Sequence, residues 1–525
     1  MIILGIGGIL GDAASAIVKD GRLVAAVEEV KVSRQHRLGA LPEASIAACL
    51  SMAGANPEDV DLVAIVRPLA SSLETGLHLQ FRARFPNSRI VLVDHHAAHA
   101  ASAFYASPFS EATVLTLDRA GDFRCGARWK ASGVQLVLEK EIYYPDSLGD
   151  LYGRVTELLG FKANADEHKV QWLSVTGDDR FRELFLEIMA AKPGEWPRID
   201  RSFIDAERMT LGGFSEKFLG RVGITAVSGV PSALRPHLAA GLQRAIESIV
   251  LEMAGRGGNL CLAGGLGFNA LLVASLERSG HWDSVFAQPC AGNAGTALGS
   301  VFHGWHHIVG ESARLSIGNL CLGPSFSAED IKQVLENCKL RFRYLLTTEE
   351  LLEAAIAQIN QHRIVAWMQG RMEFGPRALG NRSILASPLD PYSTENLNAF
   401  IKHREAFRKF AASVPEELAA EYFEVGPNAR FLATVGRARK EHRGKFESAI
   451  LSGDLIRVHT VSRDDNPLYW KLLHAAGEAT GLPVLYNTSF NLFGDPLVCT
   501  PRDAVRSFYS SGIDTLFAGN FVVQK

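Results

Sequence analysis

Short apolar runs and longer stretches with helical spacing alternate along this chain. Runs of apolar or β-branched residues that end in glycine or polar turns predict strands. They cover residues 2–6, 23–27, 60–66, 90–93, 259–263, 364–368, 457–461 and 483–486. Apolar residues at helical spacing predict helices at residues 42–53, 232–254, 349–361, 397–402 and 467–480. Strands that alternate with helices are typical of an α/β protein with mixed sheets.

A change in composition at residues 320–327 divides the chain into two expected domains. With 525 residues, of which 47% are hydrophobic, the chain is long enough for two or three domains with large cores. We interpret the segment as a linker, which places the domains at residues 1–325 and 345–525. Residues 177–231 contain several prolines and no clear periodicity, so we expect an irregular insertion there.

Charge and cysteine content exclude several classes of protein. The formal net charge of −3 and the pI near 6.6 predict no generally basic surface, so we expect no nucleic-acid partner. No stretch reaches the length of about 20 apolar residues that a membrane span needs, and the N-terminal residues lack a cationic segment. We therefore expect a cytoplasmic protein without a membrane partner. The seven cysteines show no CxxC spacing and predict neither a disulfide framework nor a thiolate zinc site. The sequence leaves open whether the protein forms a homodimer.

Two histidines follow one of the predicted strands. If Asp94 caps a helix, His95 and His99 lie four residues apart on one face, which is a spacing for two imidazoles on one metal ion. Asp118, at the end of a later apolar run, is a third candidate ligand. The alternative is a pair of structural histidines and a turn aspartate, since a chain with 16 histidines produces such a spacing by chance.

Glycine-rich turns follow two other predicted strands. The first strand runs into Gly11 and Asp12, where the alternative is a plain hairpin. The strand at residues 259–263 runs into Gly264 and Gly265 at a strand–glycine–helix junction. Free backbone amides at such a junction suit a nucleotide phosphate.

The stretch at residues 369–385, QGRMEFGPRALGNRSIL, combines glycines with three arginines. Glycines let the backbone approach a ligand closely, and guanidinium groups bind phosphate or carboxylate through two parallel hydrogen bonds. Arg371, Arg377 and Arg382 therefore predict an anion site. The alternative is a tight turn with solvated arginines.

Four blocks in a fixed order carry a resemblance to a known family. They lie at residues 369–385, 401–408, 457–463 and 487–491. Together they resemble the O-carbamoyltransferases of the nodulation-protein and tobramycin-carbamoyltransferase type. The resemblance implies an N-terminal TsaD-like domain of the actin/hexokinase superfamily at residues 1–325 and a C-terminal YrdC-like mixed α/β domain at residues 345–525.

The same resemblance implies an ATP-dependent carbamoyltransferase. Such an enzyme forms carbamoyl-adenylate from carbamoyl phosphate and ATP with Mg²⁺, and passes the carbamoyl group to a small-molecule acceptor, as in antibiotic biosynthesis. The residues implied to hold the ATP phosphates and the carbamoyl group are Arg377, Lys402, Arg408, Arg457, Ser489 and Asn491. The implied catalytic residues are Arg377, Lys402, Arg408 and Asp12. Gly264, Gly265 and Asn269 are implied to bind nucleotide, and His95, His99 and Asp118 to bind one Fe²⁺ or Zn²⁺ ion.

The chain departs from the family pattern where the acceptor and the metal are expected. Gly11 stands where the family has histidine, and Asn293 stands where the family has a metal-binding aspartate. A neutral amide oxygen lacks the charge that anchors Fe²⁺ or Zn²⁺, so we expect a weakened metal site. Three hypotheses follow: a carbamoyltransferase with an unusual acceptor, an enzyme of another acyl or amide transfer through an adenylate, and a non-catalytic nucleotide-binding partner.

Overall fold

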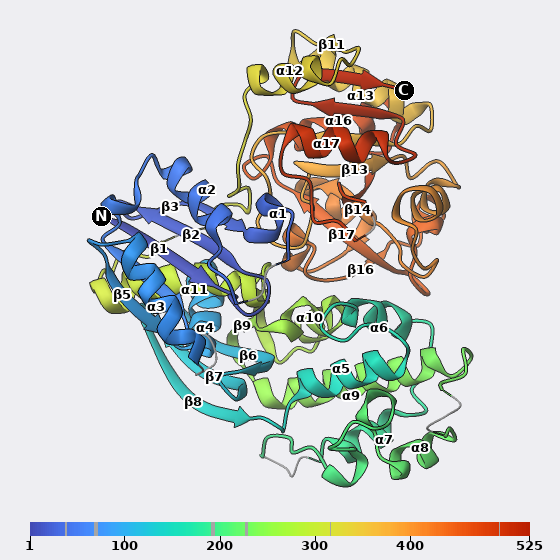
Figure 1. Cartoon of the computed structure of the whole chain (residues 1–525). Coiled ribbons are helices and arrows are strands. Elements are labelled where there is room, and N and C mark those ends of the chain that lie inside the picture. The colour runs from blue at the N-terminus through green and yellow to red at the C-terminus, as the bar shows by residue number, and fades with distance from the viewer. Residues whose placement is uncertain (37–38, 68–71, 191–194, 226–228, 316, 493) are drawn as a thin grey trace. The chain divides into compact units, whose positions relative to one another are not determined.

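The computed structural model describes residues 1–525 except 37–38, 68–71, 191–194, 226–228, 316 and 493 (Figure 1). It contains two compact units, residues 1–93 with 293–525, and residues 94–292. Both are α/β with mixed sheets, which confirms that part of the prediction. The first unit joins the two ends of the chain, so its limits differ from the expected domains at 1–325 and 345–525. Those domains, and their TsaD-like and YrdC-like architecture, stay a prediction.

The first unit begins with a five-stranded sheet in the order β3-β2-β1-β4-β5. Its strands are β1 (Ile2–Gly7), β2 (Ala14–Lys19), β3 (Arg22–Glu28), β4 (Leu62–Val66) and β5 (Arg89–Val93). β1 pairs antiparallel with β2 and parallel with β4, and all its residues are buried, which explains its uninterrupted apolar sequence. The sequence does not predict β2, because its first residues are alanine and serine, which carry little strand propensity.

Four helices accompany this sheet. They are α1 (Glu29–Ser33), α2 (Glu43–Ala53), α3 (Ser72–Arg84) and α11 (Thr296–His303), which continues into a π-helical turn at Gly304–Val309. α11 approaches β1 so closely that a side-chain carbon on Gly7 would lie 2.2 Å from Oγ1 of Thr296. A glycine at this position therefore lets helix and strand pack together.

The same unit contains a ten-stranded sheet in the order β11-β20-β19-β12-β13-β18-β14-β17-β16-β15. Its strands are β11 (Arg343–Tyr344), β12 (Val365–Met368), β13 (Arg382–Ala386), β14 (Ala411–Pro415), β15 (Phe423–Glu424), β16 (Gly436–Ala438), β17 (Leu455–Val461), β18 (Leu485–Ser489), β19 (Thr515–Ala518) and β20 (Phe521–Gln524). Ala366 and Met368 enter one hydrophobic core, whereas Val365 and Trp367 enter another. Alternate residues of β12 thus cover both faces of the sheet, which makes the strand apolar throughout.

The helices of this region are α12 (Ala328–Asn337), α13 (Thr348–Asn360), α14 (Ser393–Asn396), α15 (Ala419–Tyr422), α16 (Pro467–Thr480) and α17 (Pro501–Tyr509). α16 has the predicted limits, because its ends are locally encoded. The Asn466 side chain accepts from the Tyr469 amide at 3.1 Å, proline opens the helix, and Gly481 ends it in a left-handed conformation. The helix predicted at residues 397–402 is instead the π-helical turn Leu397–Lys402, which continues α14.

The expected linker at residues 320–327 is fixed within the first unit. The Arg371 guanidinium donates to the carbonyl oxygens of Leu322 at 2.6 Å, Gly323 at 3.0 Å and Val24 at 2.8 Å. The Ala26 amide donates to Leu322 O at 3.2 Å. The segment is therefore held between β3 and the arginine-rich stretch, and its interpretation as a linker between two domains stays a prediction.

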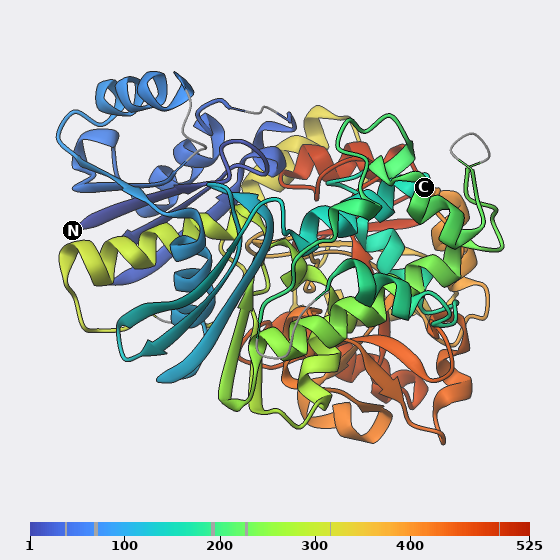
Figure 2. The same cartoon turned by 90° about the horizontal axis from the view of Figure 1, so that it is seen from below.

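The second unit contains a five-stranded sheet in the order β10-β9-β6-β7-β8. Its strands are β6 (Glu111–Gly121), β7 (Arg124–Ser132), β8 (Gln135–Tyr143), β9 (Gly257–Ala263) and β10 (Trp282–Ala287). The long antiparallel strands β6, β7 and β8 lie side by side in Figure 2.

The helices of this unit are α4 (His95–Ala106), α5 (Leu148–Leu158), α6 (Glu167–Ser174), α7 (Arg182–Ile188), α8 (Glu216–Val222), α9 (Arg235–Ala254) and α10 (Ala270–Arg278). α7 and α8 lie within residues 177–231, so the expectation of an irregular insertion is only partly met. Short helices between prolines lack the length that reveals helical periodicity. None of the described helices is long and apolar enough to cross a bilayer.

Candidate functional site

Two histidines and an aspartate meet in the second unit. The Asp94 carboxylate caps α4 by accepting from the Ala97 amide at 3.0 Å, so His95 and His99 lie on one helix face, as the spacing predicted. Asp118 comes from β6, and its Oδ2 lies 2.8 Å from Nε2 of His95 and 3.1 Å from Nε2 of His99. The two Nε2 atoms are 3.1 Å apart. The structure thus brings together the three predicted ligands.

This donor set fits one divalent metal ion. Two imidazole nitrogens and a carboxylate oxygen lie within 4.8 Å of one another, and the described residues contain no second group of this kind. Imidazole and carboxylate are ligands of Zn²⁺ and Fe²⁺. Burial lowers the pKa of His99, which keeps that ring neutral as a ligand must be. Burial alone would raise the pKa of Asp118, but the bonds from His95 and His99 hold it well below its usual range.

Two neighbours show how tightly the histidines are built in. A side-chain carbon on Gly121 would lie 2.0 Å from Cδ2 of His95, so only glycine leaves room for the ring. His96 faces away from the group, because its ring nitrogens contact Oγ1 of Thr116 at 2.8 Å and the Arg124 carbonyl at 3.0 Å. Of the three histidines in this segment, His96 is therefore the structural one.

The predicted nucleotide glycines lie beside Asp118. Gly264 has φ 88°, and a side-chain carbon there would lie 2.2 Å from the Leu117 carbonyl oxygen. A side-chain carbon on Gly265 would lie 3.2 Å from Oδ1 of Asp118. The positive φ and the close approach both require glycine at position 264. The backbone of this junction therefore packs closely against β6 beside the candidate metal ligand Asp118.

Asn269 is engaged inside the second unit. It is 7% exposed, and its Oδ1 accepts from the Leu272 amide at 3.0 Å as the cap of α10. Its Nδ2 donates to Oε1 of Gln243 at 2.8 Å, and Gln243 returns a bond of 3.1 Å. These bonds use its side chain for structure, so the nucleotide role stays a prediction without support from this geometry.

The two departures from the family pattern lie next to each other in the first unit. The atom that a side-chain carbon on Gly11 would contact is Nδ2 of Asn293, at 3.7 Å. Asp12 follows Gly11, is exposed, and has φ 62°. A side chain at position 11 would therefore contact the side chain of residue 293.

Two of the three arginines in the stretch at residues 369–385 do not form an anion site. Arg382 is completely buried, and it donates to the carbonyls of Gln369 at 2.6 Å, Asn381 at 3.0 Å and Gly370 at 3.2 Å. Arg371 bonds the carbonyls of the segment at residues 322–323, as described above. Most of their donors bond backbone carbonyls, so this geometry gives the prediction of an anion site no support at these two residues.

A buried carboxylate shapes the same stretch. Oε1 of Glu373 accepts from the amides of Leu379 at 2.9 Å, Asn381 at 2.8 Å and Arg382 at 3.0 Å. Lys31 of α1 donates to the carbonyls of Glu373 at 2.9 Å and of Gly375 at 2.6 Å. These contacts fix the turn from which the third arginine, Arg377, extends.

Arg377 belongs to a group of cations that repel one another. The group, which we call the cation cluster, consists of Arg377, Lys402, Arg404, Arg408 and Arg457. Burial and Arg408 lower the pKa of Arg377 to about 10, and burial with Arg408 lowers that of Arg404 to about 9. Burial and three arginines of the cluster hold the pKa of Arg457 well below its usual range. Repulsion among these buried cations, which the Glu405 carboxylate 3.8 Å from Arg408 offsets only in part, favours an anionic ligand.

Lys402 ties the cluster to the last block. Its ammonium donates to Ser489 O at 2.6 Å, Asn491 O at 2.9 Å and Oδ1 of Asn491 at 2.7 Å. Ser489 Oγ also donates to Oδ1 of Asn491 at 2.7 Å. Burial, followed by Arg404 and Arg408, lowers the pKa of Lys402 well below its usual range. The structure thus brings Lys402, Ser489 and Asn491 together and adds Arg404, to which sequence reasoning gave no role although it lies two residues after Lys402.

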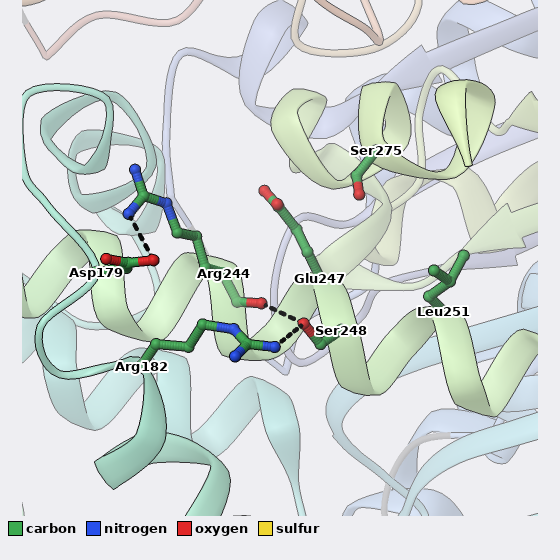
Figure 3. A pocket seen from close by; sticks show the side chains of 7 residues that line it. All are labelled: Asp179, Arg182, Arg244, Glu247, Ser248, Leu251 and Ser275. Carbon is green, nitrogen blue, oxygen red and sulfur yellow. Dashed lines mark hydrogen bonds and ion pairs between the residues drawn. The ribbon is translucent and has the colours of Figure 1, made fainter.

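A separate cavity of about 300 Å³ lies along α9 in the second unit (Figure 3). It is lined by Asp179, Arg182, Arg244, Glu247, Ser248, Leu251 and Ser275. Arg182 donates to Ser248 Oγ at 3.1 Å, and Arg244 lies 3.5 Å from Asp179. Burial raises the pKa of Glu247. Both arginines already have polar partners within the lining, so the cavity gives no clear preference for an anionic ligand.

Comparisons with known proteins identify the family. The model for the carbamoyltransferase N-terminus matches residues 2–68 and 76–302, and the model for the carbamoyltransferase C-terminus matches residues 356–525. An uncharacterized protein of Synechocystis sp. is 32% identical over 100% of this chain and 96% of that protein. The nodulation protein NolNO of Sinorhizobium fredii is 32% identical over 98% of this chain and 79% of that protein.

A third relative carries an enzymatic name. The 3'-hydroxymethylcephem-O-carbamoyltransferase of Streptomyces clavuligerus is 31% identical over 53% of this chain and 52% of that protein. Among solved structures, HypF of T. kodakarensis is 14% identical over 59% of this chain and 48% of that chain, with a TM-score of 0.34 that is too low to carry an argument. The matches to both family models confirm the resemblance, and the chain belongs to the carbamoyltransferase family of enzymes.

Proposed function

We propose that this carbamoyltransferase is ATP-dependent and forms carbamoyl-adenylate at the cation cluster before it transfers the carbamoyl group. The observation that carries the proposal is the gathering of Arg377, Arg404, Arg408 and Arg457 in one group, in which burial and neighbouring arginines lower the pKa of Arg377, Arg404 and Arg457. A triphosphate would pair with these charges and remove their repulsion. Family membership supports carbamoyl transfer, and the charge of the cluster supports a polyphosphate substrate.

The proposed first reaction is a phosphoryl-centre substitution. Water attacks the carbonyl carbon of carbamoyl phosphate, the bond from that carbon to the phosphate oxygen breaks, and carbamate and phosphate form. A carbamate oxygen then attacks the α-phosphorus of ATP. A bond forms between that oxygen and phosphorus, the bond to the β-phosphate oxygen breaks, and pyrophosphate leaves. Fixed cations stabilise the negative charge on the phosphoryl oxygens, and Mg²⁺ bound to ATP shares this task. Arg377, Arg408 and Arg457 are the residues we assign to this charge.

The fixed geometry around Lys402 supports a positioning role in the same step. Its ammonium is already bonded to the carbonyls of Ser489 and Asn491, so it holds this loop beside the arginines. A bound phosphate oxygen would favour the charged form of Lys402, which burial otherwise disfavours. Ser489 Oγ would be the neighbouring hydroxyl, and it would exchange its bond to Oδ1 of Asn491 for one to the carbamoyl oxygen.

In the proposed second reaction an acceptor oxygen or nitrogen attacks the carbamoyl carbon, and AMP leaves with its oxygen. The acceptor proton passes to a base, for which Asp12 is the candidate. His95, His99 and Asp118 would hold one Fe²⁺ or Zn²⁺ ion, which supplies Lewis-acid polarisation of the carbonyl when bound. The named cephem relative acts on a small molecule, which supports a small-molecule acceptor here. Gly11 and Asn293 would shape the space for it.

Pyrophosphate release from ATP and carbamoyl phosphate, measured without acceptor, tests the proposal. Wild type should release pyrophosphate, and Arg408→Ala should lose about 100-fold or more in kcat/KM, as when a transition-state charge partner is removed. The matched control is Arg363→Ala, an exposed arginine that bonds Gln358 at 3.0 Å outside the cation cluster. Absence of pyrophosphate from wild type, or equal rates in Arg408→Ala, would contradict the adenylation step. Release with another acyl phosphate alone would point to a different transfer reaction.

A further inference from the structure

We infer that Asn398 is the positioning residue that holds the cation cluster together while no anion is bound. This inference rests on the proposed function, since it assigns a task within the same site. Asn398 is 6% exposed and lies in the π-helical turn Leu397–Lys402. It touches none of the proposed reacting atoms, and its contacts are with the loop that carries two of the arginines.

One side-chain amide joins both arginines of this loop. Oδ1 of Asn398 accepts from Nε of Arg404 at 2.8 Å, and Nδ2 of Asn398 donates to the carbonyl oxygen of Arg408 at 3.0 Å. The Asn398 carbonyl also accepts from the Arg404 amide at 3.3 Å. The Asn398 side-chain amide thus accepts a bond at one end of the loop 404–408 and donates a bond at the other end.

The helix geometry makes this clamp possible. The wider turn at Leu397–Lys402 ends at His403, which has φ 43°, so the chain reverses immediately after Lys402. The reversal brings Arg404 back over Asn398, and the Arg404 guanidinium stacks 4.3 Å from the centre of the Phe410 ring. π-Helical turns recur at functional sites because they redirect side chains without ending the helix.

A neutral clamp suits a cluster of like charges. Arg408 acts to lower the pKa of Arg377, of Arg404 and of Lys402, and the Glu405 carboxylate 3.8 Å from Arg408 offsets only part of this repulsion. A carboxylate at position 398 would hold the arginine as well, but it would cancel part of the charge that the ligand needs. An amide fixes Arg404 and the Arg408 backbone without cancelling any charge.

The inference predicts a specific pattern in two variants. Asn398→Ala removes both bonds, and Asn398→Asp keeps the shape and the acceptor for Arg404 but loses the donor and adds a negative charge. We expect both to raise the Kd for ATP with Mg²⁺ and the KM for ATP by about 10-fold or more, the effect of losing bonds to charged groups. kcat at saturating ATP should fall much less, because the arginines themselves remain.

The matched control is Asn396→Ala. Asn396 is a half-buried asparagine at the end of α14, two residues before Asn398, and we assign it no role in the cation cluster. The measurements are ATP binding by calorimetry and pyrophosphate release at varied ATP, together with the melting temperature of each variant. The control should bind ATP like wild type.

The outcomes separate this inference from the proposed function. If wild type binds ATP but releases no pyrophosphate, the adenylation proposal fails, and the Kd values still decide the role of Asn398. If Asn398→Ala or Asn398→Asp binds ATP as tightly as wild type, the inference is overturned. A lower kcat with unchanged Kd and KM indicates a merely structural residue and also overturns it. If wild type does not bind ATP, both proposals are overturned.

Discussion

The two polar sites of this protein differ in how their charges are arranged. In the second unit Asp118 receives bonds from His95 and His99, so one carboxylate and two imidazoles stabilise one another. In the first unit the cation cluster gathers like charges, and burial together with neighbouring arginines lowers the pKa of Arg377 and of Arg457. The first arrangement is compensated without a ligand, whereas the second carries unfavourable electrostatic energy that a bound anion would relieve. A site of the second kind identifies the charge of its ligand more clearly.

The largest expected effect comes from removing the Asp118 carboxylate of the compensated site. Asp118→Asn keeps the shape but removes the charge that both histidines contact, so metal affinity should fall by at least about 100-fold, more than the loss of an outer partner causes. Carbamoyl transfer should be lost while pyrophosphate release stays at the wild-type rate. Elemental analysis and the two assays measure this, with the exposed Asp283→Asn of β10 as control. Full metal content in Asp118→Asn would show that the group is structural.

Neutralising one arginine should separate function from stability in the uncompensated site. Arg457→Met keeps much of the side-chain volume and removes a charge that burial and three arginines disfavour. We expect kcat/KM for pyrophosphate release to fall about 100-fold. The free energy of unfolding without ligand should rise by about 1 kcal/mol, because the repulsion is relieved.

Urea denaturation measures the stability change, and Arg437→Met is the control. Arg437 lies in β16 of the same unit and pairs with Asp454 at 3.3 Å, so its loss should leave activity unchanged. If Arg457→Met is both inactive and less stable, Arg457 supports the fold and the contrast between the sites is wrong.

Restoring the histidine and the aspartate that the family has at positions 11 and 293 should strengthen metal binding at the compensated site. A side-chain carbon on Gly11 would lie 3.7 Å from Nδ2 of Asn293, so Gly11→His and Asn293→Asp belong in one double variant. We expect metal affinity to rise by about 10-fold, since a charged ligand is regained. The set of accepted alcohols, amines and hydroxylamines should also change, which mass spectrometry of the products would show. If wild type makes adenylate but modifies nothing, and the double variant gains O-carbamoylation, the two residues are lesions.

The smallest expected effect is a dependence of stability on pH. The pKa of Lys402 is lowered in the folded protein, so the unfolded chain binds this proton more tightly. Stability without ligand should therefore rise with pH between the lowered pKa and the ordinary value of about 10.4. Lys402→Met should flatten this rise in urea titrations between about pH 8 and about pH 10, and bound ATP should flatten it in wild type. An equal rise in Lys402→Met would exclude Lys402 as its source.

Local patterns predicted the elements that local chemistry controls. α16 has its predicted limits because Asn466, Pro467 and Gly481 encode both ends. The pair His95 and His99 follows from the same kind of rule, since Asp94 caps the helix and four residues make one turn. Such local rules do not predict β2 or the π-helical turn at Leu397–Lys402, because strand pairing forms the first and packing forms the second.

Residue type and spacing determined by themselves that this chain carries arginines near glycines, two histidines on one helix face and an α/β succession of elements. Only the tertiary structure decided which arginines bond backbone oxygens and which arginine joins the cation cluster. Arg371 and Arg382 are bonded by carbonyl oxygens of segments remote in sequence, whereas Arg377 joins the cation cluster. The physical reason is that a guanidinium has a limited number of donors, and whether distant backbone oxygens use them depends on the folded chain.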